Sequence, residues 1–147
     1  MDPDHQLVGH WSSVPLSYGV MEASELGLLP DGQGWSSWFN VHALCVTRLR
    51  WRCPEPGVVE LHARWRVQGT PGDGTGPAAF ASTEEAEPLD EVSRHRYVIG
   101  PVVPMPGADA VAAVRFEEPV EFCMEFARGP RHIRPDEDPT FHVLPYQ

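Results

Sequence analysis

The sequence contains no lysine, few cysteines and no apolar run as long as a membrane span. Its eleven arginines stand against 21 acidic side chains, which gives a formal net charge of −10. A protein this acidic repels phosphate backbones and anionic headgroups, so nucleic acid and membrane surfaces are poor candidate partners. A helix that spans a membrane needs about 20 consecutive apolar residues, and no segment approaches that length.

The three cysteines, Cys45, Cys53 and Cys123, lack the paired spacing of a zinc or redox site and lie within apolar patterns. Because they are odd in number, we expect them to be reduced and buried rather than joined in a disulfide framework. The amino-terminal segment 1–11 is acidic where a secretory signal is basic, and this indicates a cytoplasmic location.

Proline and glycine, by contrast, are abundant. Sixteen prolines and thirteen glycines divide the chain into pieces too short for most helices. Between these breaks, apolar and polar residues alternate with the period of two that marks a strand buried on one side. Residues 58–67 place Val59, Leu61, Ala63, Trp65 and Val67 on one face.

Residues 46–53 alternate in the same way, and a turn at 54–57 joins them to the next strand as a hairpin. Leu49, Trp51 and Cys53 oppose Arg48, Arg50 and Arg52. Further strands are expected at 8–18, 24–29, 34–40, 92–103, 110–117 and 120–128, with Phe122, Met124 and Phe126 facing inward in the last.

These eight strands predict an all-β fold, an antiparallel up-and-down β-barrel, because closing the sheet removes its exposed edges. If consecutive strands are neighbours, the turns at 30–34, 54–57 and 104–109 lie together at one closed end. The long segment 69–91 then lies at the other end, and its glycine, proline and acidic content indicates a mobile loop. That loop is either a lid over an entrance or a disordered segment without function.

The domain organisation follows from this pattern. A single barrel domain is expected over residues 1–129, and residues 130–147 form an extended tail that wraps the outside of the barrel or is disordered. Within 34–40, Trp35 and Phe39 share the inward face, whereas Trp38 is expected on the outer surface under a covering tail or a partner.

The segment 7–11, with Gly9 and Trp11, resembles the G-x-W signature that opens the first strand of the lipocalin and wider calycin superfamily. In that family the tryptophan closes the narrow end of a barrel, and an arginine late in the last strand packs across it. Arg128 lies at the matching position here. The resemblance implies that Gly9, Trp11 and Arg128 are structural residues rather than a ligand site.

The expected barrel interior is rich in aromatic rings, which favours a small, mainly apolar or aromatic ligand. The same rings could equally fill the barrel as a core. The interior residues expected from the pattern are Trp35, Phe39, Leu49, Trp51, Leu61, Trp65, Tyr97, Phe122 and Met124. The residues expected to contact a ligand are Tyr18, Phe39, His42, Trp51, Trp65, Arg94, Tyr97, Phe122 and Met124.

His95 and Tyr97 share an inward phase, so they are the candidate acid and base if the protein is an enzyme, supported by Glu22 or Arg94. His95 could also be a satisfied core histidine. The sequence has no nucleophile elbow, phosphate-binding loop or H-E-x-x-H helix. We expect no metal, because no two histidines alternate on one inward strand, and we expect no cofactor.

Three functions remain open at this stage. The first is binding of a small molecule in the barrel cavity. The second is a biosynthetic cyclase or isomerase that shapes a reactive intermediate in the same cavity. The third is a protein-interaction module that uses a basic outer hairpin to bind either an acidic partner or segment 84–91 of a second copy in a homodimer. Its basic residues are Arg48, Arg50, Arg52, Arg64 and Arg66.

Overall fold

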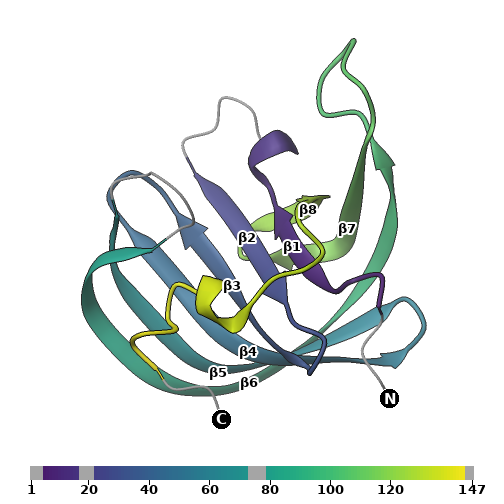
Figure 1. Ribbon diagram of the computed structural model, residues 1–147. Coiled ribbons are helices and arrows are strands. Elements are labelled where there is room, and N and C mark those ends of the chain that lie inside the picture. Colours follow the sequence, from purple (N-terminus) through teal and green to yellow (C-terminus); the bar gives the residue numbers. More distant parts are fainter. Residues whose placement is uncertain (1–4, 17–21, 73–78, 145–147) are drawn as a thin grey trace.

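The computed structural model describes residues 5–16, 22–72 and 79–144. Eight strands form a closed barrel in which each strand pairs with its neighbours in the sequence and the last pairs with the first, always antiparallel (Figure 1). The predicted all-β, up-and-down architecture is confirmed. The elements are β1 (Gly9–Ser12), η1 (Val14–Leu16), β2 (Ala23–Leu28), β3 (Gln33–Phe39), β4 (Leu44–Glu55), β5 (Val58–Pro71), β6 (Phe80–Val102), β7 (Val111–Val120), β8 (Cys123–Arg128) and η2 (Pro135–Glu137).

One end of the barrel is closed by a dense apolar core. Trp11 is fully buried and donates its Nε1 hydrogen to the Leu7 carbonyl oxygen at 2.9 Å. The guanidinium carbon of Arg128 lies 3.9 Å from the centroid of the Trp11 ring, so the predicted contact between these two side chains is confirmed. The residues that fill this half of the interior include Leu26, Leu28, Leu49, Trp51, Val59, Leu61, Tyr97, Val114, Phe116 and Phe126.

A bulge in β5 reverses which side chains face inward. Arg48 pairs with Trp65 and Leu49 pairs with Ala63, which leaves Arg64 as the extra residue. Before the bulge Leu61 and Ala63 face the interior, but beyond it Trp65 lies on the outer face, because an inserted residue shifts the alternation by one position. The predicted inward position of Trp65 is therefore wrong.

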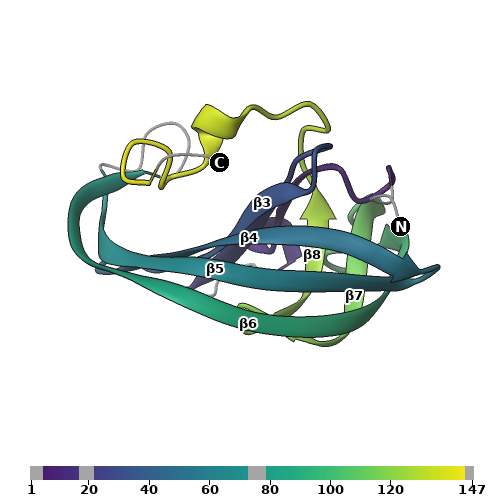
Figure 2. The same cartoon turned by 90° about the horizontal axis from the view of Figure 1, so that it is seen from below.

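The segment 69–91 was predicted to be a loop, but within its described parts residues 69–71 and 80–91 are strand residues of β5 and β6. Strand β6 begins at Phe80 and pairs with β5 from there to Arg96, whereas it pairs with β7 only from Tyr97 onward. Its side chains between 81 and 94 are mostly exposed on both faces, so no alternation marks the strand. Charged side chains and proline, here Pro88, are typical of edge strands, where they oppose pairing with strands of other molecules. Figure 2 shows the hairpin of β5 and β6 curling toward the C-terminal segment.

A tight turn at Glu121 and Phe122 splits the strand predicted at 120–128. Val120 pairs with Cys123, and the two residues between them have φ angles of 50° and 70°. Positive φ at both central residues is the geometry of a type I′ hairpin turn. Residues 118 and 119, which separate the strands predicted at 110–117 and 120–128, instead belong to β7, where the pairing with β8 is irregular.

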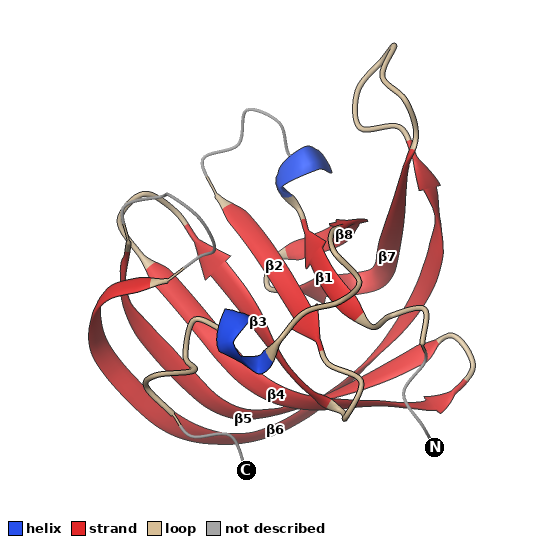
Figure 3. Cartoon of the chain, in the orientation of Figure 1, coloured by secondary structure: helices blue, strands red, loops and turns tan. Residues whose placement is uncertain are grey.

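A second apolar cluster lies on the outer face of β3 and β4. Trp35, Leu44 and Val46 are buried there with Leu29, and Ile133 of the C-terminal segment packs against them. The helix η2 and the segments beside it lie across these strands in Figure 3. The tail therefore wraps the outside of the barrel, which is one of the two states expected for it.

A buried ion pair fastens this tail. Arg48 Nε lies 3.3 Å from Asp138 Oδ2, and the two side chains are 8% and 0% exposed. Arg48 Nη2 also donates to the carbonyl oxygen of Thr140 at 3.0 Å and to its Oγ1 at 2.8 Å. These contacts satisfy charges that would otherwise be costly to bury.

The covering tail reverses the expected orientation of β3. Trp35 lies outside the barrel, against Gly27, where an added Cβ would collide with the indole ring. Phe39 packs against the same outer cluster, whereas Trp38 lies on the inward face with Ser36. The predicted inward positions of Trp35 and Phe39 and the outward position of Trp38 are wrong, because the tail covers the outer face of the strand and lets apolar side chains be buried there.

Candidate functional site

A cavity of about 380 Å³ lies between the inner faces of β3 to β6 and the hairpin turn after β7. It lies beyond the apolar core of the closed end. The free edge of β6 borders it, since Glu91 and Ser93 line the cavity and are exposed. The lining residues are Ser36, Thr47, Leu49, Leu61, Ala63, Arg66, Glu91, Val92, Ser93, His95, Pro119, Val120 and Glu121.

His95 is the one predicted catalytic residue that lines this cavity. Its Nε2 lies 3.0 Å from Ser93 Oγ, and its ring makes an edge contact with Phe116 at a centroid distance of 6.0 Å. Nδ1 is buried and makes no hydrogen bond to any residue that the structure describes. Burial lowers the pKa of His95, and Glu118 opposes that shift. The neutral imidazole is therefore favoured, and it can accept a proton or a hydrogen bond.

Glu121 is held in the cavity wall from two sides. Ser24 Oγ donates to its carbonyl oxygen at 2.6 Å, and Ser36 Oγ donates to its Oε1 at 2.7 Å. Both serines lie on the inward faces of β2 and β3, so the turn is anchored across the mouth of the barrel. The sequence pattern did not identify Glu121, because neither turn residue is the glycine or asparagine that usually marks such a hairpin.

Arg66 and Cys45 add further polar groups near Glu121. Arg66 faces inward because of the bulge in β5, and its Nη1 lies 4.0 Å from Glu87 Oε1. Burial raises the pKa of the Cys45 thiol, and the negative charges of Glu121 and Glu87 raise it further, while Arg66 acts in the opposite direction. Cys45 is therefore a protonated, weakly reactive thiol at neutral pH.

Tyr97 and Trp51 belong to the core rather than to the cavity lining. Tyr97 is 8% exposed, and its Oη lies 3.9 Å from Cys53 Sγ. Trp51 is 3% exposed and donates its Nε1 hydrogen to the Leu29 carbonyl oxygen at 3.0 Å. The cavity therefore brings together His95 and Glu121, not the predicted pair of His95 and Tyr97.

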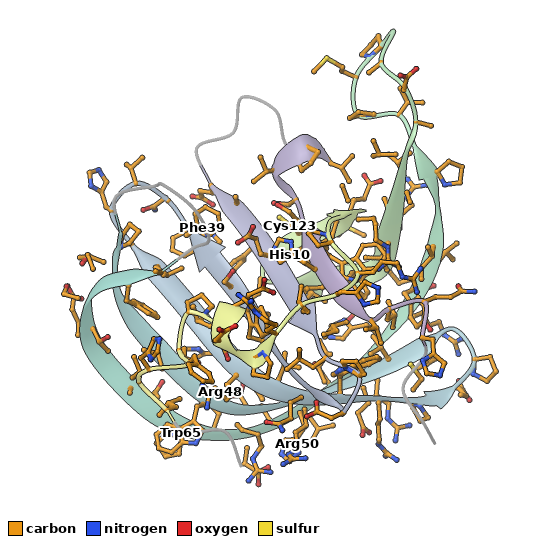
Figure 4. All side chains as sticks on the ribbon, viewed as in Figure 1. His10, Phe39, Arg48, Arg50, Trp65 and Cys123 are labelled. Atoms are coloured by element: carbon orange, nitrogen blue, oxygen red, sulfur yellow. The ribbon has the colours of Figure 1, made fainter. Side chains whose placement is uncertain are left out.

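Arg94 and His42 lie away from the cavity. Arg94 faces outward, one position from His95, and its Nε lies 3.1 Å from Glu60 Oε1. His42 is exposed in the turn between β3 and β4. Figure 4 shows Trp65 and Arg50 projecting from the outer side of the long strands.

Among the other predicted ligand contacts, Phe122 and Met124 are 80% and 46% exposed. Neither residue lines the cavity, and the ring of Phe122 instead makes an edge contact with Trp38 at a centroid distance of 6.3 Å. Glu22, expected to support catalysis, is exposed and accepts a hydrogen bond from Trp38 Nε1 at 3.2 Å. Tyr18 lies outside the described residues.

The basic stripe predicted on the outer hairpin is not continuous. Arg48 is buried under the tail, and Arg66 faces inward. Arg50, Arg52 and Arg64 are the exposed arginines of the set, and Arg52 forms an ion pair with Glu60. These changes follow from the bulge and the tail, neither of which alternation in the sequence reveals.

A second depression of about 500 Å³ lies on the outer face of β6 and β7. Arg96 and Arg115 line it with Val98, which is 68% exposed, and Arg96 lies 3.9 Å from Glu117. Tyr97 and Phe116 also line it, but its side chains on the outer side of the barrel, Arg96, Arg115 and Glu117, are exposed and offer no buried polar group to orient a ligand. The interior cavity is therefore the better candidate site.

Across residues 5–16, 22–72 and 79–144, no three or more histidine, cysteine or acidic side chains gather as ligands for a metal ion. In the same ranges, no helix has the length and apolar character to cross a membrane. No family model, curated protein or solved structure matches the chain. The arrangement of the cavity is thus the basis for a functional conclusion: it offers an apolar wall, several hydrogen-bonding groups and a neutral histidine.

Proposed function

We propose that the protein binds a small organic molecule in the interior cavity of its barrel. The observation that carries this proposal is the cavity itself, about 380 Å³ in volume, with Leu49, Leu61 and Val120 on its apolar side and His95 and Glu121 among its polar groups. Ligand pockets of proteins typically measure about 300 to 1,000 Å³ and combine apolar walls with a few polar groups.

The lining refines the ligand expected from sequence. The large rings of Trp51, Phe116 and Phe126 fill the closed half of the barrel as core. The cavity wall instead alternates small polar residues such as Ser36 and Thr47 with aliphatic ones. A ligand with an apolar body and at least one polar group therefore fits this site better than a wholly apolar one.

The test uses the neutral dye N-phenyl-1-naphthylamine, whose emission rises in apolar surroundings. Ala63 lines the cavity, so Ala63→Leu fills part of it, whereas Ala112→Leu adds the same group at an exposed position of β7. We expect saturable binding to the wild type and to Ala112→Leu, and binding at least about tenfold weaker, or 1.4 kcal/mol, to Ala63→Leu. Equal binding to all three proteins would place the dye elsewhere and refute the proposal.

The closed end supports a relationship to lipocalin-like barrels within this proposal. A buried tryptophan in the first strand under an arginine of the last strand is the arrangement that the resemblance of segment 7–11 implied. Barrels of eight strands have room for one small ligand beside their core. The contact between Trp11 and Arg128 is thus consistent with a binding barrel of this type.

A cyclase- or isomerase-type enzyme is the second candidate, because His95 lines the cavity with a buried, free Nδ1 among the described residues. A neutral imidazole beside a bound substrate can take a proton at one carbon and return it at another. Tyr97 has no part in this version, because it belongs to the core.

Hydrolysis of 4-nitrophenyl acetate tests whether His95 is a reactive base that a substrate can reach. We expect His95→Gln to lose most of the protein-dependent rate, whereas His42→Gln, which removes an exposed histidine, keeps it. Because the sequence has no lysine, side-chain amines add little background reaction with the ester. Equal rates for both variants and the wild type would remove His95 as a proton-transfer residue.

A further inference from the structure

The walls of the interior cavity carry more negative than positive charge. Two carboxylates, Glu91 and Glu121, and one guanidinium, that of Arg66, line it. Arg66 already faces the carboxylate of Glu87 at 4.0 Å, so its positive charge is partly balanced from outside the lining. An anionic ligand would add to the remaining excess of negative charge, whereas a cation would reduce it.

Glu121 is placed to receive such a cation. Its φ angle of 50° lies in the left-handed region, which is unusual for glutamate and is retained where surrounding contacts enforce it. Those contacts are the hydrogen bonds from Ser24 and Ser36, which fix the main chain and one carboxylate oxygen. An ionised carboxylate has about four acceptor sites, so this bond to Ser36 leaves capacity for a further N–H donor.

Two aromatic rings meet at the turn that carries Glu121. Phe122 follows Glu121 in the turn, and Trp38 lies two residues after Ser36 on the same inward face of β3. Their rings meet edge to face at 6.3 Å, and Phe122 remains 80% exposed. The faces of aromatic rings attract cations, most strongly in the case of tryptophan.

We propose that the interior cavity accepts a protonated amine with an apolar body, whose ammonium group is bound by the carboxylate of Glu121. The apolar body lies against Leu49, Leu61 and Val120, which line the same cavity. This inference rests on the proposed function, because it names the ligand class of that site. A second carboxylate in the lining supports it, because Glu91 adds negative charge at the exposed edge.

The test compares three compounds that share one apolar body and differ in charge: 3,3-diphenylpropylammonium, 3,3-diphenylpropan-1-ol and 3,3-diphenylpropanoate. Each is titrated by calorimetry into the wild type, Glu121→Gln and Glu117→Gln. The first variant removes the charge but keeps an acceptor for Ser36, and the second removes a charge from the exposed outer side of β7. A further titration uses Ala63→Leu to show that binding occurs in the cavity.

We expect the ammonium compound to bind the wild type at least about tenfold more tightly than the alcohol, and the carboxylate to bind weakest. Glu121→Gln should remove the preference for the ammonium compound without weakening the alcohol, and Glu117→Gln should preserve it. If the alcohol or the carboxylate binds best, and Ala63→Leu weakens that binding, the cation inference fails while the proposed function stands. If none of the three compounds binds, or Ala63→Leu changes nothing, both are overturned.

Discussion

The guanidinium carbon of Arg128 lies 3.9 Å from the centroid of the Trp11 ring, at the closed end of the barrel. The same guanidinium donates to the carbonyl oxygen of Val8 at 2.8 Å and to that of Gln6. The last strand is thereby fastened to the segment before the first, where the pairing of β8 with β1 covers only two residue pairs. A single side chain thus supports the closure of the barrel.

Arg128→Leu should therefore lower the free energy of unfolding by about 2 to 3 kcal/mol, because it removes a cation–π contact and two charged hydrogen bonds. Chemical denaturation measures the change. Arg131→Leu is the control, since Arg131 is exposed and makes one hydrogen bond to the His5 carbonyl oxygen at 3.0 Å. Equal effects of the two substitutions would show that the ring contact contributes little.

Gly27→Ala should destabilise the barrel by about 1 to 3 kcal/mol, the usual cost of forcing an added methyl into a packed site. The new Cβ would meet the Trp35 ring, which the tail holds in place. Gly100→Ala is a matched control within a strand, because an added Cβ there meets nothing within 4 Å. Thermal unfolding of both variants measures the loss of stability. A Gly27→Ala variant as stable as the wild type would contradict the described packing of Trp35.

Arg48→Met should lower the free energy of unfolding by about 3 kcal/mol, because it leaves the buried carboxylate of Asp138 without its charged partner. The C-terminal segment should also become sensitive to limited proteolysis. Arg50→Met, two residues along the same strand and exposed, should change stability by less than about 0.5 kcal/mol. A tail that stays protected in Arg48→Met would show that the apolar contacts of Ile133 suffice to hold it.

The stability of the protein should depend on pH through His95. Burial places the pKa of the folded state below 6.5, so the unfolded chain takes up the proton first as pH falls. This contribution to stability is present above pH 6.5 and is lost as pH falls through the folded pKa. Urea denaturation at several pH values should show a smaller acid-side loss for His95→Gln than for the wild type and for His42→Gln. Parallel curves for all three would contradict the burial of His95.

Local patterns in the sequence predicted the features that depend on neighbouring residues alone. The hairpin of β4 and β5, with its turn near Gly57, follows from alternation, whereas the contact of Trp11 with Arg128 was implied by the resemblance of segment 7–11. The strand structure of segment 80–91 was not predicted, because it arises from main-chain pairing with β5 while the side chains stay mostly exposed.

The candidate site was harder to predict, because it depends on the C-terminal tail, the bulge in β5 and the turn at Glu121, none of which alternation reveals. Alternation showed that Trp35 and Trp38 lie on opposite faces, but the tail decides which face is inside. The bulge at Arg64 moves Arg66 into the cavity and Trp65 out of it. His95 was found because its stretch of β6 keeps a regular phase, whereas Glu121 depends on a turn without the usual sequence signal.

The most direct test of the binding cavity is a methyl spectrum of the leucine- and valine-labelled protein, recorded with and without N-phenyl-1-naphthylamine. The cavity methyls of Leu49, Leu61 and Val120 should shift and show contacts to the dye protons. Leu44 and Val46, buried under the tail on the outer face, should not respond. Shifts confined to the outer cluster, or contacts to exposed residues alone, would contradict a binding site inside the barrel.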